Sequence, residues 1–564
     1  MLDKSPLPFD LAFVPPCTPS FAELVEQLDA TTDLSSTRRR DMISGLRRVA
    51  DALGRPMNEV PSDGRWLQPR LARVSPVILN MSPKTWQNTV SNARSAMAHC
   101  GIVERRFRRI EDLNDDWRSL WQTVLELNDP TLPTALLRFV HFLNHVRVAP
   151  DDVRDTHTRD YREAVMLNEI SKDPETAYRA AVNGWNLARQ RVPGWPDIVL
   201  TLPSRQKKIA LPLDHFPQSF IADLDALMQR LSAPDPLSDD DIRVLRPATL
   251  FQYRRDILRF ASELCHAGMD STSITKLADL ITPENAERGL RQMLARNDQK
   301  TSRGISQVAA LLRNLARMLK APKATQDRLK KLAGKLAVQQ PQGMTAKNRE
   351  RLRLLQDETH QHRLLILPES VFSRPFGDEK RYSILLARED ALAIAILIVC
   401  PLRVKSLAGL ELDRHIQRPG DGRVFLVLEE ADTKTGRSLE FELPRDVVKL
   451  MDKHLATRSP LLCPSGTQFL FPKRSGAQPI DPNALSTRIA KRVRKETGLV
   501  MNTHLFRHFA VMLWLDANPG GYEVARRLLG HSDLSHTINM YSGLEITTAT
   551  RAFSDLITEK RRGR

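Results

Sequence analysis

The chain has 564 residues, which is too long for one compact core and predicts three or four domains. Its net charge of +17 favours a polyanionic partner, nucleic acid above all, although a merely basic protein would show the same excess. The longest apolar run, Ala391 to Leu402, is shorter than the roughly 20 residues that cross a bilayer, so we expect no membrane partner and interpret the run as a buried helix.

The cysteine pattern argues against a disulfide framework and against a zinc site. There are five cysteines, an odd number, and they lie far apart with no CxxC pair. This usage fits a reducing cytosol. The first residues also lack the charged-then-apolar order of a signal peptide, so we expect a cytoplasmic protein.

The first half of the chain is predicted to be helical in two regions. Residues 1–110 would form a helical N-terminal region preceded by a loose arm, because the first 35 residues are rich in Pro, Ser and Thr and helical spacing begins at Thr37. Residues 111–200 would form a second helical region. Residues 201–245 contain several prolines and a basic run, and we expect them to be a connector in which a helix is possible only near Phe220 to Leu231.

Basic clusters in this half suggest a role in binding. Arginines occupy Arg38 to Arg40, and four more flank Phe107 in the run 105–109. We expect residues 1–245 to bind DNA or neighbouring protomers. A solvated helical face would explain the same clusters.

The second half is predicted to contain a compact helical unit at 246–342 and a mixed domain at 343–564. Thr249 is an acceptable cap for the first helix of the helical unit. In the mixed domain, Val424 to Leu428 and Ser438 to Leu443 have strand character, and Thr435-Gly436 supplies a turn before the second segment. The fold class is therefore mainly α with a small β-sheet, with an α+β C-terminal domain.

Six residues in the last third form a candidate site for phosphodiester chemistry. A phenol such as Tyr541 is a poor nucleophile near neutral pH, because its ordinary pKa is about 10, but cations around it and an in-line phosphate make it useful. His504 and Arg507 are three residues apart on one predicted helical face and could grip two phosphate oxygens. A surface His-Arg pair is the simpler interpretation of the same spacing. The full set is Arg403, Lys434, His504, Arg507, His531 and Tyr541.

The other three members have structural alternatives as well. Arg403 follows an apolar helix and needs an anion, which could be a phosphate or a structural carboxylate. Lys434 lies just before the hairpin turn and could protonate a departing oxygen, or could be an ordinary exposed lysine. His531 follows a Leu-Leu-Gly helix stop and could donate to a phosphate or cap the helix.

The order and surroundings of these residues resemble the tyrosine recombinases, the phage-integrase and Xer group of DNA strand-transfer enzymes. The resemblance covers residues 345–555 clearly, and 246–342 resembles the family's core-binding domain more faintly. Two details depart from the family pattern near Arg403: Ser406 stands where a glutamate is common, and Cys-Pro-Leu precedes the arginine in place of Thr-Gly-Leu. The segments that carry the resemblance are His504-Leu-Phe-Arg-His-Phe-Ala, Asn518-Pro-Gly-Gly, Arg526-Arg-Leu-Leu-Gly-His and Thr537-Ile-Asn-Met-Tyr541.

The resemblance implies a mechanism and partners. Tyr541 would attack a phosphate of double-stranded DNA and form a 3′-phosphotyrosyl link, while Arg403 and Arg507 hold the non-bridging oxygens. Lys434 would be the general acid, and His504 and His531 would assist proton transfer. Neither a metal nor another cofactor is implied. The expected assembly is a homotetramer on synapsed sites, or one with partner recombinases, in a bacterial cytoplasm and associated with the nucleoid.

Two alternatives remain beside a recombinase that integrates or excises a mobile element. A type IB topoisomerase-like nicking and closing enzyme would use the same residues. A DNA-binding accessory protein without catalysis would bind DNA but form no covalent adduct.

Overall fold

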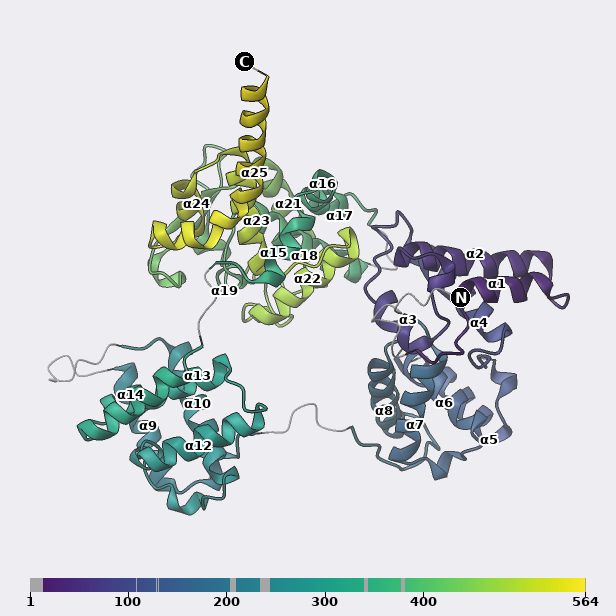
Figure 1. Ribbon diagram of the computed structural model, residues 1–564, viewed down its shortest axis with the longest axis horizontal. Helices are drawn as coiled ribbons and strands as arrows, with labels where there is room; N and C mark the ends of the chain where they lie inside the picture. The colour runs from purple at the N-terminus through teal and green to yellow at the C-terminus, as the bar shows by residue number, and fades with distance from the viewer. Residues whose placement is uncertain are drawn as a thin grey trace. The chain divides into compact units, whose positions relative to one another are not determined.

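The protein is described here by a computed structural model (Figure 1). It describes residues 14–107, 109–127, 129, 131–202, 209–233, 244–338, 343–376 and 381–562, except for the side chains of 542–549 and 551–552. The chain divides into two compact units, one of residues 1–202 with 342–564 and the other of residues 203–341. None of the described helices is long and apolar enough to cross a membrane.

The N-terminal 202 residues contain two helical clusters, each with its own apolar core. The first cluster packs α2 against α4, and Gly45 permits this approach because a Cβ there would lie 2.7 Å from the backbone nitrogen of Ala93. Its helices are α1 (Phe21–Ala30), α2 (Ser36–Leu53), η2 (Met57–Glu59), α3 (Gly64–Leu71) and α4 (Pro83–His99). The second cluster contains η3 (Ile110–Asp112), α5 (Asp115–Glu126), α6 (Thr131–His145), η4 (Pro150–Asp152), α7 (Asp155–Asn168) and α8 (Pro174–Arg191).

The second unit corrects the expectation of a connector over 201–245. Part of that stretch is α9, whose apolar face, including Phe220 and Leu224, is buried in the same core as the following helices. Pro217 caps the start of α9, so this proline marks a helix boundary and not a stretch without structure. The helices here are η5 (Leu213–His215), α9 (Gln218–Ser232), α10 (Pro247–His266), η6 (Ser271–Ser273), α11 (Leu277–Leu280), α12 (Pro283–Arg296), α13 (Arg303–Met318) and α14 (Lys323–Lys335).

The C-terminal part is a helical bundle with a small sheet. Its central helix, α18, is buried along most of its length, which agrees with the apolar run seen in the sequence. The helices are α15 (Ala346–Leu354), α16 (Glu358–Leu365), α17 (Leu367–Phe372), α18 (Arg381–Val399), α19 (Val404–Ala408), α20 (Leu412–His415), η8 (Glu430–Asp432), α21 (Arg445–Thr457), α22 (Pro482–Thr497), α23 (Thr503–Ala517), α24 (Tyr522–Leu529) and α25 (Leu534–Arg561).

The sheet has three antiparallel strands in the order β1-β2-β3. They are β1 (Ile416–Gln417), β2 (Phe425–Leu428) and β3 (Leu439–Glu442), with Ile416 opposite Leu426 and Phe425 opposite Glu442. Leu439 and Phe441 of β3 are half-buried while Glu440 and Glu442 are exposed, as the alternation predicts. The expected fold class, mainly α with a small β-sheet, is confirmed.

Candidate active site

Arg403 is placed by the end of the buried helix α18. The chain leaves α18 at Val399, and Arg403 becomes the residue before α19, with its side chain half-buried. Burial lowers the pKa of its guanidinium. Arg403 forms no ion pair with any described residue. No described carboxylate therefore forms the structural salt bridge that was the alternative for this arginine.

Arg507 connects three segments of the site. It lies on α23, is only 3% exposed, and donates one hydrogen bond to the carbonyl of Pro401 and another, of 2.7 Å, to the carbonyl of Leu529. Pro401 is two residues before Arg403, and Leu529 is two before His531. Burial, followed by the charge of Arg403, lowers the pKa of Arg507 to about 10, while Tyr541 opposes the shift.

The two histidines of the predicted set face these arginines. The ring of His504 reaches the surface, yet desolvation of its inner side, followed by Arg507 and Arg403, lowers its pKa. His531 follows Gly530, which caps α24 in the left-handed conformation at φ +58°. Burial lowers the pKa of His531 to about 4, with further contributions from Arg507, His536, Arg403 and His504. Its Nδ1 lies 3.0 Å from the hydroxyl of Thr537.

Tyr541 is on α25, and its side chain is only 2% exposed. Its hydroxyl lies 3.0 Å from Nδ1 of His508, and the two rings meet edge to face at 5.4 Å. Burial raises the pKa of the phenol to about 12, while Arg507 acts in the opposite direction. The phenol is therefore protonated near neutral pH and docked against an imidazole.

Lys434 occupies an exposed loop between η8 and β3, and contacts none of the other five residues in the described structure. The loop itself is fastened to the site, because Arg437 donates to the carbonyls of His531 and Ser532 at 3.4 and 3.3 Å. On the other side, the hydroxyl of Ser406 donates to the carbonyl of Asp432 at 3.3 Å. A lysine on this loop has a flexible chain next to the arginine and histidine cluster.

The structure thus brings together Arg403, His504, Arg507, His531 and Tyr541, and places Lys434 on an adjoining loop. Sequence reasoning missed three contributors, His508, Arg437 and Thr537. His508 could have been found, because it is four residues after His504 on one helix and the rings lie 4.8 Å apart. Nothing in the sequence distinguishes Arg437, since its contacts depend on how β3 packs against the end of α24.

Comparison with known proteins gives a family for part of the chain. Residues 382–545 match the phage integrase family. This part of the chain is therefore a phage integrase domain. No curated protein matches the sequence.

Several solved structures are similar to the chain. XerA recombinase is 15% identical with a TM-score of 0.25, over 55% of this chain and 92% of that one. XerH site-specific recombinase bound to a palindromic difH substrate is 12% identical with a TM-score of 0.32, over 59% and 94%. A lambda integrase tetramer bound to a Holliday junction is 16% identical with a TM-score of 0.34, over 65% and 89%.

Proposed function

We propose that this protein cuts and rejoins double-stranded DNA through a 3′-phosphotyrosyl intermediate, with Tyr541 as the nucleophile. The phenol oxygen bonds to the scissile phosphorus, and its proton passes to His504, which reaches the surface. The bond from phosphorus to the 5′-oxygen breaks, and that oxygen takes a proton from Lys434. The tyrosyl ester keeps the free energy of the broken bond, so a 5′-hydroxyl from another strand can reverse the step and complete the exchange.

The remaining residues stabilise and orient the phosphate. Arg403 and Arg507 would hold the non-bridging oxygens while negative charge builds, and His504 and His531 would orient the phosphate and assist proton transfer. One observation carries the proposal: Arg507 hydrogen-bonds the segments that bear Arg403 and His531 and lies close enough to influence the pKa of Tyr541.

The assembly follows from the chemistry. Exchange between two duplexes cuts four strands, and each protomer has one Tyr541, so we propose a tetramer on synapsed sites, formed by this chain alone or with partner recombinases. We further propose that residues 246–342, together with α9, grip the core site beside the catalytic domain at 343–564. The two N-terminal regions, 1–110 and 111–200, would contact DNA or protomers beyond it. Integration or excision of a mobile element at the nucleoid is the proposed role.

A denaturing-gel assay tests the proposal. DNA fragments flanking the gene, nicked near the attack site so that the short cut strand diffuses away, should trap a covalent adduct with the wild-type chain and none with Tyr541→Phe. Absence of an adduct from the wild-type chain, despite bound DNA, would favour a catalytically silent accessory protein. Relaxation of supercoils without any recombinant product would favour a topoisomerase-like enzyme.

A further inference from the structure

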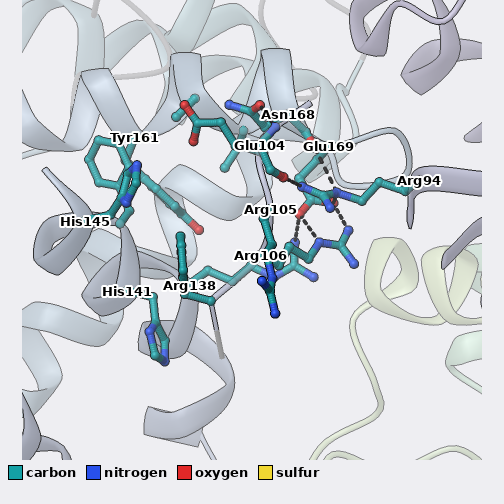
Figure 2. A pocket seen from close by; sticks show the side chains of 14 residues that line it. Arg94, Glu104, Arg105, Arg106, Arg138, His141, His145, Tyr161, Asn168 and Glu169 are labelled. Carbon is teal, nitrogen blue, oxygen red and sulfur yellow. Dashed lines mark hydrogen bonds and ion pairs between the residues drawn. The ribbon is translucent and has the colours of Figure 1, made fainter. Parts of the chain in front are cut away.

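Three arginines surround one buried carboxylate in the N-terminal part of the chain. Glu169, directly after α7, is 6% exposed. Arg106 grips it with two hydrogen bonds, Arg94 of α4 lies 3.6 Å away, and Arg138 of α6 lies 3.3 Å away. Figure 2 shows Arg94 and Arg106 converging on this carboxylate. Burial raises the pKa of Glu169, but the arginines more than offset it and hold the pKa below its usual value, so one negative charge faces three positive ones.

A pocket of about 110 Å³ opens beside this cluster. Four arginines and two glutamates line it, which gives a formal surplus of two positive charges with the histidines neutral. A pocket of this volume has room for a phosphate group. Its charge and size therefore suit a small anionic group.

Part of the arginine cluster has a structural role. Arg94 donates to the carbonyls of Asn168 and Glu104 at 2.9 and 2.7 Å, and Gln68 donates to Val165 near the end of α7. These contacts join the two helical clusters of the N-terminal part. Arg94 and Arg106 are thus occupied, and a bound anion would have to use other donors.

Other donors are present at the same pocket. Arg105 is exposed and forms no ion pair with any described residue. The Nη1 atom of Arg138 is buried and donates no hydrogen bond within the described part of the chain, although it lies 3.3 Å from the carboxylate of Glu169 as an ion-pair partner. Tyr161 is buried at the pocket wall, and burial raises the pKa of its phenol to about 12, so the hydroxyl keeps its proton and can donate.

An aromatic surface borders these donors. Phe107 is 41% exposed, and its ring stacks on His145 at 5.4 Å and 26°. An exposed aromatic ring between arginines is a surface on which a sugar or a base can pack. The simpler alternative, that Phe107 only shields His145, leaves Arg105 without a role.

We propose that this pocket holds a backbone phosphate of DNA outside the segment cut by Tyr541, with Arg105 and Arg138 as its ligands and Phe107 packed against the adjoining sugar. The inference rests on the proposed function, because it takes DNA to be the substrate. It gives the N-terminal part of the chain a defined DNA contact. That contact lies outside residues 382–545, the segment that matches the family.

Salt dependence of binding by the full-length chain tests the contact. Each phosphate contact adds about 0.9 to the slope of log Kobs against log salt, so Arg105→Ala should lower the slope by about that amount on a long duplex. Affinity should fall about 3- to 10-fold at low salt. Arg159→Ala is the matched control, since it removes an exposed arginine of α7 that does not line the pocket. Arg138→Gln should behave like Arg105→Ala, because Glu169 keeps two arginine partners.

A duplex shortened to the core site separates the two proposals. On it, Arg105→Ala should match the wild-type chain both in binding and in covalent adduct yield. Equal slopes for Arg105→Ala and Arg159→Ala on the long duplex would overturn the DNA contact while leaving the adduct intact. A second outcome would also overturn the DNA contact, in favour of a small anion. In that outcome, inorganic phosphate or a deoxynucleoside monophosphate stabilises the wild-type chain but not Arg105→Ala, and the salt slopes of DNA binding are equal. Loss of the adduct with the wild-type chain would instead defeat the proposed function.

Discussion

Among the described residues, the hydroxyl of Tyr541 has one hydrogen-bond partner, His508. The protonation state of this imidazole decides whether it can act as a base or only as an acceptor. Burial and the neighbouring His504, Arg507 and His531 lower its pKa to about 3. An imidazole with so low a pKa is too weak a base to take a proton from a phenol whose pKa is about 12. It can accept a hydrogen bond, however, so we assign His508 a positioning role.

A pair of substitutions checks this role. His508→Ala should slow single-turnover adduct formation about fivefold, because a hydrogen bond of about 1 kcal/mol that orients the phenol is lost. His508→Asn keeps an acceptor near the position of Nδ1 and should recover most of the rate. DNA affinity should be unchanged in both. If Asn were as slow as Ala and both were reduced more than a hundredfold, the imidazole would be a proton carrier.

Lys434 can be tested through the leaving group. Lys434→Ala should greatly slow adduct formation on ordinary DNA, by about 10²- to 10⁴-fold, since the 5′-oxygen must leave without a proton. A substrate with sulfur at the 5′-bridging position should restore the rate, because a thiol with a pKa of about 8.5 leaves as an anion unaided. Lys449→Ala, an exposed lysine of α21, is the control. Slow cleavage of the sulfur substrate by Lys434→Ala would remove the lysine from the acid role.

The sequence could nominate these site residues but not their contacts. The spacing from His504 to Arg507 fixes a shared helical face, and Leu-Leu-Gly fixes the left-handed residue before His531. By contrast, the docking of Tyr541 on His508 depends on how α25 packs against α23, over a separation of 33 residues. No local pattern encodes such a contact.

At the scale of elements, helix starts are predicted well where a capping residue or an initial proline marks them. α4 and α8 both begin at a proline, Pro83 and Pro174, a residue that suits the first position of a helix. α10 begins at Pro247, so Thr249, expected to be its cap, lies inside the first turn. α25 continues past Tyr541 to Arg561, through Gly543, and no proline lies in its later turns to end it.

α21 has a buried histidine that makes the stability of the C-terminal bundle depend on pH. His454 is fully buried, and neither ring nitrogen has a hydrogen-bond partner among the described residues. Burial lowers its pKa to about 4, Glu389 opposes the shift, and Arg458, Arg488 and Arg388 reinforce it. The unfolded chain therefore binds a proton at this histidine below about pH 6.5, whereas the folded chain binds it only below about pH 4. The free energy of unfolding falls as the pH drops from about 6.5 to about 4.

His454→Leu should weaken that dependence. From about pH 7 to about pH 5, the free energy of unfolding should fall less in the variant, by about one proton's contribution, or roughly 1.4 kcal/mol per pH unit at most. Near neutral pH the variant should be more stable by about 1 kcal/mol, because two unsatisfied polar atoms are removed. Urea unfolding at both pH values measures this, with His362→Leu, at an exposed position of α16, as the control. A fall equal to that of the wild-type chain would contradict it.

At the scale of the whole molecule, the apolar cores are local in sequence. The core of the second unit contains residues from 216 to 333, and the C-terminal core contains residues from 344 to 541. The prolines of 201–245 suggested a connector. Four apolar residues of α9 are spaced to form one helical face, but the sequence does not show that this face packs against α10. A truncated chain should therefore fold only if it keeps all the residues of each core that it contains.

Two truncations test this division. A chain of residues 246–564 lacks α9 and with it four buried side chains, Phe220, Leu224, Leu227 and Leu231. Their burial is worth roughly 6 to 12 kcal/mol in total, which is comparable to the stability of a whole domain. We expect 246–564 to be cleaved rapidly within α10–α14 by a protease and to bind DNA weakly. A chain of residues 209–564 keeps both cores and should resist the protease and form the Tyr541 adduct, with a shorter DNA footprint than the full chain. Equal resistance of the two truncations would show that α9 is dispensable, and equal footprints of 209–564 and the full chain would exclude a DNA contact by the first 202 residues.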